Sequence, residues 1–229
     1  MILWLVYLAI LSFFLGFHIN NFFYADDFFH PAYVSFVKNP LKTLWHYYLG
    51  DAFWRPLTIF SDYLSLKLFD QNPAGWHLID LVLLSIDAIL LAILARSIFE
   101  KATLGFENTG SKRALIFSSA LCGMIFLLHP ISLLTGAWTA CRADVLGGVF
   151  ALISLIITIK GVLKKKPLAF VFAGVFSILA YLCKESYFFL PLLAPFLAVF
   201  SGEKLKEKSW LGVWIFLSYA IAFSFYIYV

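Results

Sequence analysis

Residues 75–98 read GWHLIDLVLLSIDAILLAILARSI, an apolar run that is long enough to cross a bilayer as a single helix. A membrane-spanning helix needs about 17–25 consecutive and mostly apolar residues. Windows of the same kind lie at residues 1–19, 113–129, 143–160, 167–183, 187–201 and 209–229. The sequence therefore predicts an all-α integral membrane protein, with about seven transmembrane helices in one module that covers residues 1–229.

The composition of the chain supports this class. Of its 229 residues, 62% are hydrophobic and 13% are charged, whereas a soluble domain averages about 45–50% apolar and about 25% charged residues. The net charge of +4 is too small to indicate nucleic-acid binding, so we expect no nucleic-acid partner. Three cysteines lie singly in or beside apolar runs and match neither metal-ligand spacing nor a disulfide framework: Cys122, Cys141 and Cys183.

The basic residues predict the orientation of the chain, because Lys and Arg in short loops are retained on the cytoplasmic side. Most of the 17 Lys and Arg residues lie in the connections 96–113, 160–166 and 203–208, which alternate along the chain. We therefore expect a cytoplasmic N-terminus and an outer loop at residues 20–74. On this topology the polar side chains gather on the extracytoplasmic face, towards the periplasm, the exterior or the lumen of the endoplasmic reticulum.

The outer loop 20–74 carries signals for two helices of its own. In NPLKTLWHYYLG, Asn39 suits a helix N-cap and Pro40 suits the first helical position. A second helix is predicted to begin at Arg55-Pro56 and to end at the turn DQNPAG, residues 70–75. Both helices have an apolar stripe, so we expect them to lie in the membrane interface beside the acidic residues of the loop.

Those acidic residues lie in NNFFYADDFFHPAY, residues 20–33, where Asp26 and Asp27 are adjacent and surrounded by aromatic side chains. Ionisable groups at a membrane are costly and commonly functional. A carboxylate that is desolvated or lies beside a second carboxylate binds a proton more readily, which suits a general base. The structural alternative is that the pair forms a helix cap or a turn ahead of Pro31.

Four blocks of the sequence resemble, in the same order, the glycosyltransferase-C superfamily of polytopic enzymes that use lipid-linked sugars. The closest likeness is to the transmembrane O-mannosyltransferases that carry tetratricopeptide repeats. The resemblance covers residues 20 to about 190 and rests on YADDFFH, WRPLTIFSDYLSLKLF with NPAGWHLIDLVLL, HPISLLTGAWTACRADVLGGVFALISL, and KES. The chain departs from the family at Ser132 and Leu134, where a second His and a Glu are usual, and at Asp80 and Leu84, where Asn and His are usual.

This resemblance implies an activity, namely inverting transfer of a sugar from a polyprenyl-phosphate donor to an acceptor hydroxyl of a protein or glycan. It implies that an acid of the pair is the general base, for which we take Asp26, with Asp27 orienting it or contacting the acceptor. No tetratricopeptide repeat follows in these 229 residues. We therefore expect the chain to be the N-terminal module of a longer protein, or to work with a partner subunit.

The leaving phosphate of such a donor needs cations or directed hydrogen-bond donors. Arg142 is the first candidate, because Arg can hold phosphate through two parallel hydrogen bonds, and Lys184 is the second. His129 could also donate a hydrogen bond if it is protonated. The alternatives are an ion pair of Arg142 with Asp144, a pair of Lys184 with Glu185 or a lipid headgroup, and a capping role for His129.

Other ionisable residues on or near the predicted outer face complete the set of site candidates: His30, Arg55, His77, Asp80, Asp144 and Glu185. Asp87 continues the stripe of His77 and Asp80 to the middle of the second membrane helix, where it should face a polar cavity or a Tyr or Ser partner. We assign no cofactor and no metal site. A divalent ion at Asp26, Asp27 and His30 is an open alternative, since these are hard to borderline ligands.

Two other classes of function fit the composition. A transporter could use His77, Asp80 and Asp87 as a proton relay, although the chain shows no inverted repeat with broken helices. A non-catalytic membrane subunit of the same fold is the other possibility. Transfer of a different lipid-linked group is indistinguishable from sugar transfer at the level of sequence.

Overall fold

The computed structural model describes residues 21–39, 54–102, 109–164, 166, 168–190, 193 and 209–228, and every regular element within them is helical. The prediction of an all-α protein is therefore confirmed for this part of the chain. Its elements are η1 (Ala25–Phe28), α2 (Phe29–Phe36), α3 (Pro56–Phe69), α4 (Pro73–Ala102), α5 (Thr109–Leu128), α6 (Pro130–Ala137), η3 (Thr139–Cys141), α7 (Arg142–Lys164), α8 (Leu168–Tyr181), η4 (Glu185–Phe189) and α10 (Ser209–Tyr228).

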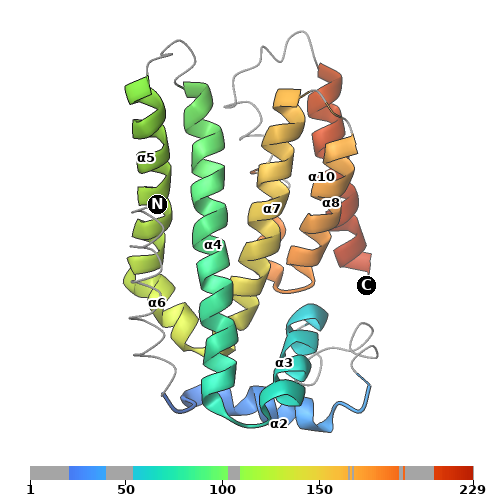
Figure 1. The fold of residues 1–229 in the computed structure, drawn as a ribbon. Helices are drawn as coiled ribbons and strands as arrows, with labels where there is room; N and C mark the ends of the chain where they lie inside the picture. The colour runs from blue at the N-terminus through green and yellow to red at the C-terminus, as the bar shows by residue number, and fades with distance from the viewer. Residues whose placement is uncertain are drawn as a thin grey trace.

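The long helices α4, α5, α7, α8 and α10 lie side by side, and the short helices α2, α3 and α6 gather at one end of this bundle (Figure 1). We call this the site end, because α4 and α7 both begin there with the charged residues predicted to be functional. At the opposite end, α4 and α7 finish and α5 begins, and there the chain carries Arg96, Lys112, Arg113, Lys160 and Lys164. Among the described residues this end is therefore rich in basic side chains, while the site end holds acids together with Arg55, Arg142 and Lys184.

Within the described residues, two helices are long and apolar enough to cross a membrane: Pro73–Glu100, and Thr139–Lys164, which joins η3 to α7. The segments Lys112–Leu128 and Pro130–Ala137 form a third span if they are taken together, with a bend of 59° at His129-Pro130. The apolar helices Leu168–Tyr181 and Gly212–Ser224 are shorter. The structure therefore supports two or three of the seven predicted spans, and window 1–19 and most of 187–201 lie outside the described residues.

The helix predicted to begin at Arg55-Pro56 is present as α3, with Pro56 in its first turn and its end before Asp70. The other predicted loop helix, in residues 39–50, lies almost entirely outside the described residues. The apolar stripe of α3 does not face the protein, since Phe60, Leu64 and Leu68 are exposed. Its buried face is instead Thr58, Ile59, Asp62 and Ser65, so α3 presents polar groups to the bundle.

The helices α7, α8 and α10 are joined by hydroxyl groups inside an otherwise apolar core. Ser154 Oγ lies 2.6 Å from the hydroxyl of Tyr219 and 3.0 Å from Ser177 Oγ. Thr158 Oγ1 lies 2.9 Å from the same Tyr219 hydroxyl, and all four side chains are fully buried. A Cβ at Gly174 would lie 3.2 Å from the Ser218 carbonyl oxygen, so a glycine lets α8 and α10 approach closely. Hydrogen bonds between closely packed helices of this kind are typical of membrane bundles.

We predict that Tyr219→Phe lowers the free energy of unfolding by about 0.6–1.7 kcal/mol, the range measured for interhelical hydrogen bonds in a membrane protein. The substitution keeps the ring and removes the hydroxyl that links α10 to Ser154 and Thr158. Unfolding of the purified protein in detergent measures the change. Ser97→Ala is the matched control, because that exposed hydroxyl bonds only to Ile93 O of its own helix. An unchanged stability of Tyr219→Phe would contradict the prediction.

Candidate functional site

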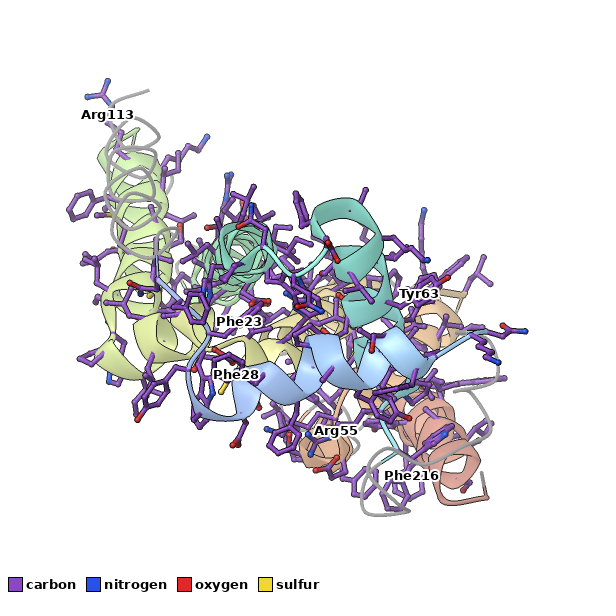
Figure 2. All side chains as sticks on the ribbon, turned by 90° about the horizontal axis from the view of Figure 1, so that it is seen from below. Phe23, Phe28, Arg55, Tyr63, Arg113 and Phe216 are labelled. Carbon is purple, nitrogen blue, oxygen red and sulfur yellow. The ribbon has the colours of Figure 1, made fainter. Side chains whose placement is uncertain are left out.

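The two adjacent acids at the site end have opposite environments. Ala25 has a φ of 48°, in the left-handed region that residues with a Cβ rarely adopt. The chain turns there into η1, which leaves Asp26 exposed and Asp27 fully buried. Of the aromatic side chains around the turn, Phe22 is 73% exposed and Phe28 is 50% exposed, whereas Phe23 is buried. Figure 2 looks onto this end of the bundle and shows the segment with Phe23 and Phe28 lying across it.

Asp27 is a structural link rather than an open group. Its Oδ2 accepts a hydrogen bond from the backbone N–H of Tyr24 at 3.1 Å. Its Oδ1 accepts one from the backbone N–H of Ala140, in η3, at 2.8 Å. Within the part of the chain that the structure describes, the Asp26 carboxylate has no hydrogen-bond partner. Of the two acids predicted to be catalytic, Asp26 is therefore the one available to a substrate.

Arg142 lies in a buried cluster at the start of α7. Its Nε donates to Asp80 Oδ1 at 2.6 Å, and its Nη1 donates to Asp62 Oδ1 at 2.9 Å. Nη1 also donates to Ser65 Oγ at 2.6 Å, and Nη2 donates to the Trp76 carbonyl oxygen at 3.1 Å. The guanidinium lies 4.9 Å from the centre of the Trp76 ring and is fully buried.

These contacts bear on the two roles that the sequence suggested for Arg142, which are phosphate binding and an ion pair with Asp144. An ion pair with Asp144 is wrong, because the acidic partners of Arg142 are Asp80 and Asp62. Phosphate binding needs open N–H groups, and four hydrogen bonds to neighbouring groups already occupy this guanidinium. In this structure Arg142 therefore joins α3, α4 and α7 and is closed to a ligand.

His30 extends the Arg142 cluster to α2. Its Nδ1 lies 2.7 Å from Asp62 Oδ2, and its side chain is 11% exposed. Burial alone lowers the pKa of His30, but the charge and hydrogen bond of Asp62 outweigh it, so the pKa is raised above its usual 6.5. Arg142 opposes this rise and Asp27 adds to it. Protonated His30 therefore stabilises the contact between α2 and α3.

Lys184 is a partly open cation at the site end. Its Nζ donates to both carboxylate oxygens of Asp144 at 2.7 Å. The side chain of Lys184 is 24% exposed and that of Asp144 is 37% exposed, so water reaches this pair. The alternative pairing of Lys184 with Glu185 is wrong in this structure. A half-exposed ion pair can exchange partners at low cost, which a fully buried pair cannot.

Glu185 is instead paired with Arg55, at the start of α3. Arg55 Nε donates to Glu185 Oε2 at 3.0 Å, and Arg55 Nη2 donates to Glu185 Oε1. Burial raises the pKa of Glu185, but its hydrogen bonds, led by the one from Arg55, hold the net value below the ordinary range. The first residues of α3 also bond to the end of α8, through Leu57 N to Leu182 O at 3.1 Å.

The two remaining histidine candidates differ in exposure. His129 is exposed and caps α6, where its Nδ1 accepts from the Ile131 N–H at 3.3 Å, so the predicted capping role is observed. His77 is fully buried on the same helix as Asp80, and its ring centre lies 6.2 Å from that of Phe23. Neither ring nitrogen of His77 has a hydrogen-bond partner among the described residues.

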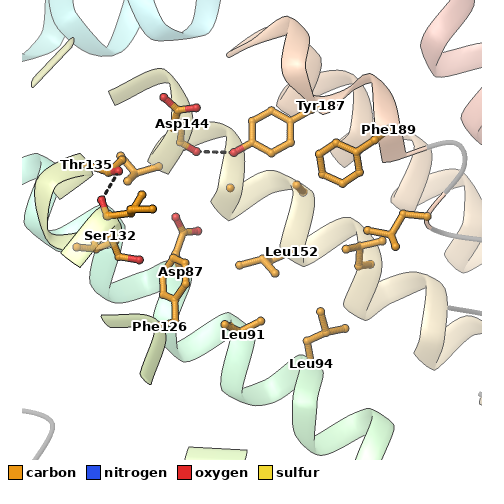
Figure 3. Close-up of a pocket in the computed structure, with 17 residues that line it drawn as sticks. Asp87, Leu91, Leu94, Phe126, Ser132, Thr135, Asp144, Leu152, Tyr187 and Phe189 are labelled. Carbon is orange, nitrogen blue, oxygen red and sulfur yellow. Dashed lines mark hydrogen bonds between the residues drawn. The ribbon is translucent and has the colours of Figure 1, made fainter. Parts of the chain in front are cut away.

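An apolar cavity of about 530 Å³ opens between α4, α6, α7 and η4 (Figure 3). Asp144 lies on its wall, and Tyr187 beside it donates its hydroxyl to the Asp144 carbonyl oxygen at 2.5 Å. Most of the wall is aliphatic, with Leu91, Leu94 and Leu152 among its residues. Asp87, which the sequence predicted to face a polar cavity or a Tyr or Ser partner, lines this cavity together with Tyr187 and Ser132, but most of the wall is apolar.

The predicted charged residues therefore meet around η3. Cys141 of this short helix interacts electrostatically with Asp144, Lys184, Asp27 and Asp80. Among the described residues, no group of three or more His, Cys, Asp or Glu side chains is arranged to hold a metal ion. Asp62 and Ser65 were missed from the sequence, since they lie on the face of α3 opposite its apolar stripe.

Comparison with known proteins identifies no similar protein, so a functional assignment has to rest on the geometry of the site. No protein-family model matches the sequence, and neither the curated proteins nor the solved structures give a match.

We predict that Arg142→Met destabilises the protein by about 3–5 kcal/mol, because it leaves Asp62 and Asp80 buried without a cation. Loss of monodisperse protein on gel filtration and a lower melting temperature measure the effect. Arg142→Met combined with Asp62→Asn and Asp80→Asn should recover much of the loss, since the buried charges go together. Arg113→Met, at an exposed position, is the control. A stable Arg142→Met protein would argue against the cluster.

We predict a pH-dependent contribution of His30 to stability. Because its folded pKa lies above the ordinary 6.5, the contribution is complete below pH 6.5 and is lost as the pH rises through the folded value. The groups that face His30 are Asp62, Arg142 and Asp27. The difference in melting temperature between the wild type and His30→Gln should therefore shrink with rising pH. A difference that is constant or grows with pH would refute this role.

Proposed function

We propose that this protein is a membrane glycosyltransferase that moves a sugar from a polyprenyl-phosphate donor to an acceptor hydroxyl of a protein or a glycan. One observation carries the proposal. An exposed carboxylate, Asp26, and a partly open cation, Lys184, lie at the site end of the bundle, and an apolar cavity along α4 and α7 has Asp144, the partner of Lys184, on its wall. These are the base, the phosphate-binding group and the apolar surface that this reaction needs.

Asp26 is the general base of the proposed reaction. It accepts the proton of the acceptor hydroxyl as that oxygen attacks the anomeric carbon. The new bond forms between the acceptor oxygen and the sugar while the bond to the donor phosphate breaks, so the configuration inverts. Buried Asp27 holds the turn through Tyr24 and Ala140 and keeps Asp26 directed outwards.

Lys184 is the cation that stabilises the phosphate leaving group. Its pair with Asp144 is water-accessible, so the ammonium can move from the carboxylate to a phosphate as negative charge develops there. Arg142 has a different role from the one predicted, since its buried bonds fix the helices that carry the site. The ion pair of Arg55 with Glu185 fixes α3 against the segment after Lys184.

The proposal includes the placement of the protein in the membrane. Arg96, Lys112, Arg113, Lys160 and Lys164 belong to the end of the bundle opposite the acids, which supports a cytoplasmic location for that end. The site end then faces the periplasm, the exterior or the lumen of the endoplasmic reticulum. Seven spans and a cytoplasmic N-terminus belong to the same proposal, as does a partner subunit or further domain that binds the acceptor.

A non-catalytic subunit of the same fold is the second candidate. It is favoured because the Arg142 guanidinium is buried and already hydrogen-bonded, so it is closed to a ligand. With that guanidinium occupied, the described site end offers a phosphate fewer cations than the sequence suggested. Such a subunit would bind the lipid-linked donor through Lys184 and the cavity and transfer nothing. Donor binding and sugar transfer must therefore be measured separately.

We predict that Asp26→Asn lowers transfer by about 100-fold or more, which starts at the lower end of the range for general-base catalysis, while donor binding and stability stay near wild type. Membranes that contain the full chain are supplied with radiolabelled polyprenyl-phosphate sugars, and both retained and transferred label are counted. Asp70→Asn is the matched control, an exposed acid in the turn between α3 and α4.

The two candidates give different results in this assay. Transfer by the wild type that is lost in Asp26→Asn supports the enzyme. Binding of label without transfer by the wild type supports the non-catalytic subunit. Transfer by Asp26→Asn at the wild-type rate removes Asp26 from the base role.

A further inference from the structure

Asp87 is the ionisable residue of the bundle that the proposed reaction leaves unused. It lies near the middle of the span Pro73–Glu100 and is 3% exposed. Its side chain lines the apolar cavity, into which the carboxylate points in Figure 3. Its Oδ1 has no hydrogen-bond partner among the residues that the structure describes. A buried carboxyl group in this setting is costly unless something pairs with it.

Three neighbouring polar groups are already engaged elsewhere, and a fourth, Ser132, also lines the cavity. Tyr187 lies close enough to interact electrostatically with Asp87, but its hydroxyl donates to the Asp144 carbonyl oxygen. Thr135 Oγ1 donates to the Ile131 carbonyl oxygen at 2.7 Å. The cation nearest the mouth of the cavity, Lys184, is bonded to Asp144. These protein groups therefore do not pair with the Asp87 carboxylate, which remains available to a ligand in the cavity.

A glycine on the facing helix makes room for the Asp87 carboxylate. Gly148 of α7 faces it, and a Cβ at that position would lie 2.7 Å from Asp87 Oδ2. Any larger residue at Gly148 would push the carboxylate aside. The same Cβ would lie 3.1 Å from Oδ1, so both carboxylate oxygens lie close to α7, at the wall of the cavity.

The shape and chemistry of the cavity define the ligand class. A volume of about 530 Å³ falls in the range of small-molecule sites. Its aliphatic wall, with Leu91, Leu94, Leu152 and Leu155, suits a hydrocarbon chain. An anionic head group beside Asp87 is disfavoured by repulsion, whereas a hydroxyl or an amine can donate to its carboxylate.

We propose that this cavity binds an amphipathic molecule with an apolar chain and a hydrogen-bond-donating head group, a hydroxyl or an amine, that pairs with Asp87. The same cavity is the apolar surface proposed for the donor chain, so the two ligands would compete for it, but the test of this site does not require sugar transfer. Asp87 recognises the head group and the leucines hold the chain. The depth of Asp87 within the span makes the ligand a molecule that enters from the bilayer.

The test uses the full chain in lipid nanodiscs with two photoreactive probes of equal chain length, a long-chain alcohol and a long-chain amine. Saturable labelling of peptides from α4 and α7, competed by unlabelled probe, is the expected result for the wild type. Asp87→Leu keeps the site apolar and removes the acceptor, so the affinity for the bound probe should fall about tenfold. Ser85→Ala is the matched control, a buried hydroxyl of the same helix that bonds to Leu81 O.

Two further variants make the test decisive. Leu152→Trp fills the cavity without touching Asp87 and should abolish saturable labelling by either probe. Asp87→Asn keeps an oxygen acceptor and removes the negative charge, so it should retain the alcohol and lose the amine. Saturable labelling by one probe or by both supports the site and names its head group. Labelling that does not saturate, or that is equal in the wild type, Asp87→Leu and Leu152→Trp, overturns the proposal.

Discussion

The charge of Arg142, buried where water cannot reach it, is the constraint around which the site end is built. Two elements other than its own supply the groups that satisfy this guanidinium: Asp62 and Ser65 from α3, and Asp80 and the Trp76 carbonyl from α4. His30 of α2 joins the cluster through Asp62. When His30 is protonated the cluster holds two cations and two anions. The charge balance explains why a helix as short as α2 is held in a defined position.

Burial then divides the charged residues of this end into two kinds. The Arg142 cluster is closed to water, so its carboxylates are occupied by the fold. The pair of Lys184 with Asp144 and the carboxylate of Asp26 remain accessible. A charged group takes part in chemistry only if it can change partners, and Coulomb attraction in a dry interior prevents that. Exposure therefore assigns the chemical roles more reliably than residue type does.

Much of the helical framework follows from the sequence, because Pro56, Pro73 and Pro130 stand in first helical turns and apolar runs give the helix lengths. The partners of Arg142 do not follow from it, since they lie 62 and 80 residues away along the chain. The helical spacing of apolar residues predicts the apolar stripe of α3, but this spacing does not show whether the stripe faces protein or lipid. Asp26 is exposed and Asp27 is buried because the backbone of Ala25 is left-handed, and the sequence does not predict that conformation.

The 62 residues between Asp80 and Arg142 also have a consequence for how the chain is made. At about 5–20 residues per second, Asp80 leaves the ribosome roughly 3–12 s before its cation does. During that interval α4 exists with an acid near one end and no partner for it, beside lipid that solvates charge poorly. The nascent helix must keep Asp80 at the water boundary, or carry it protonated, until α7 is synthesised. Correct insertion of an early helix is thus coupled to the arrival of a later one.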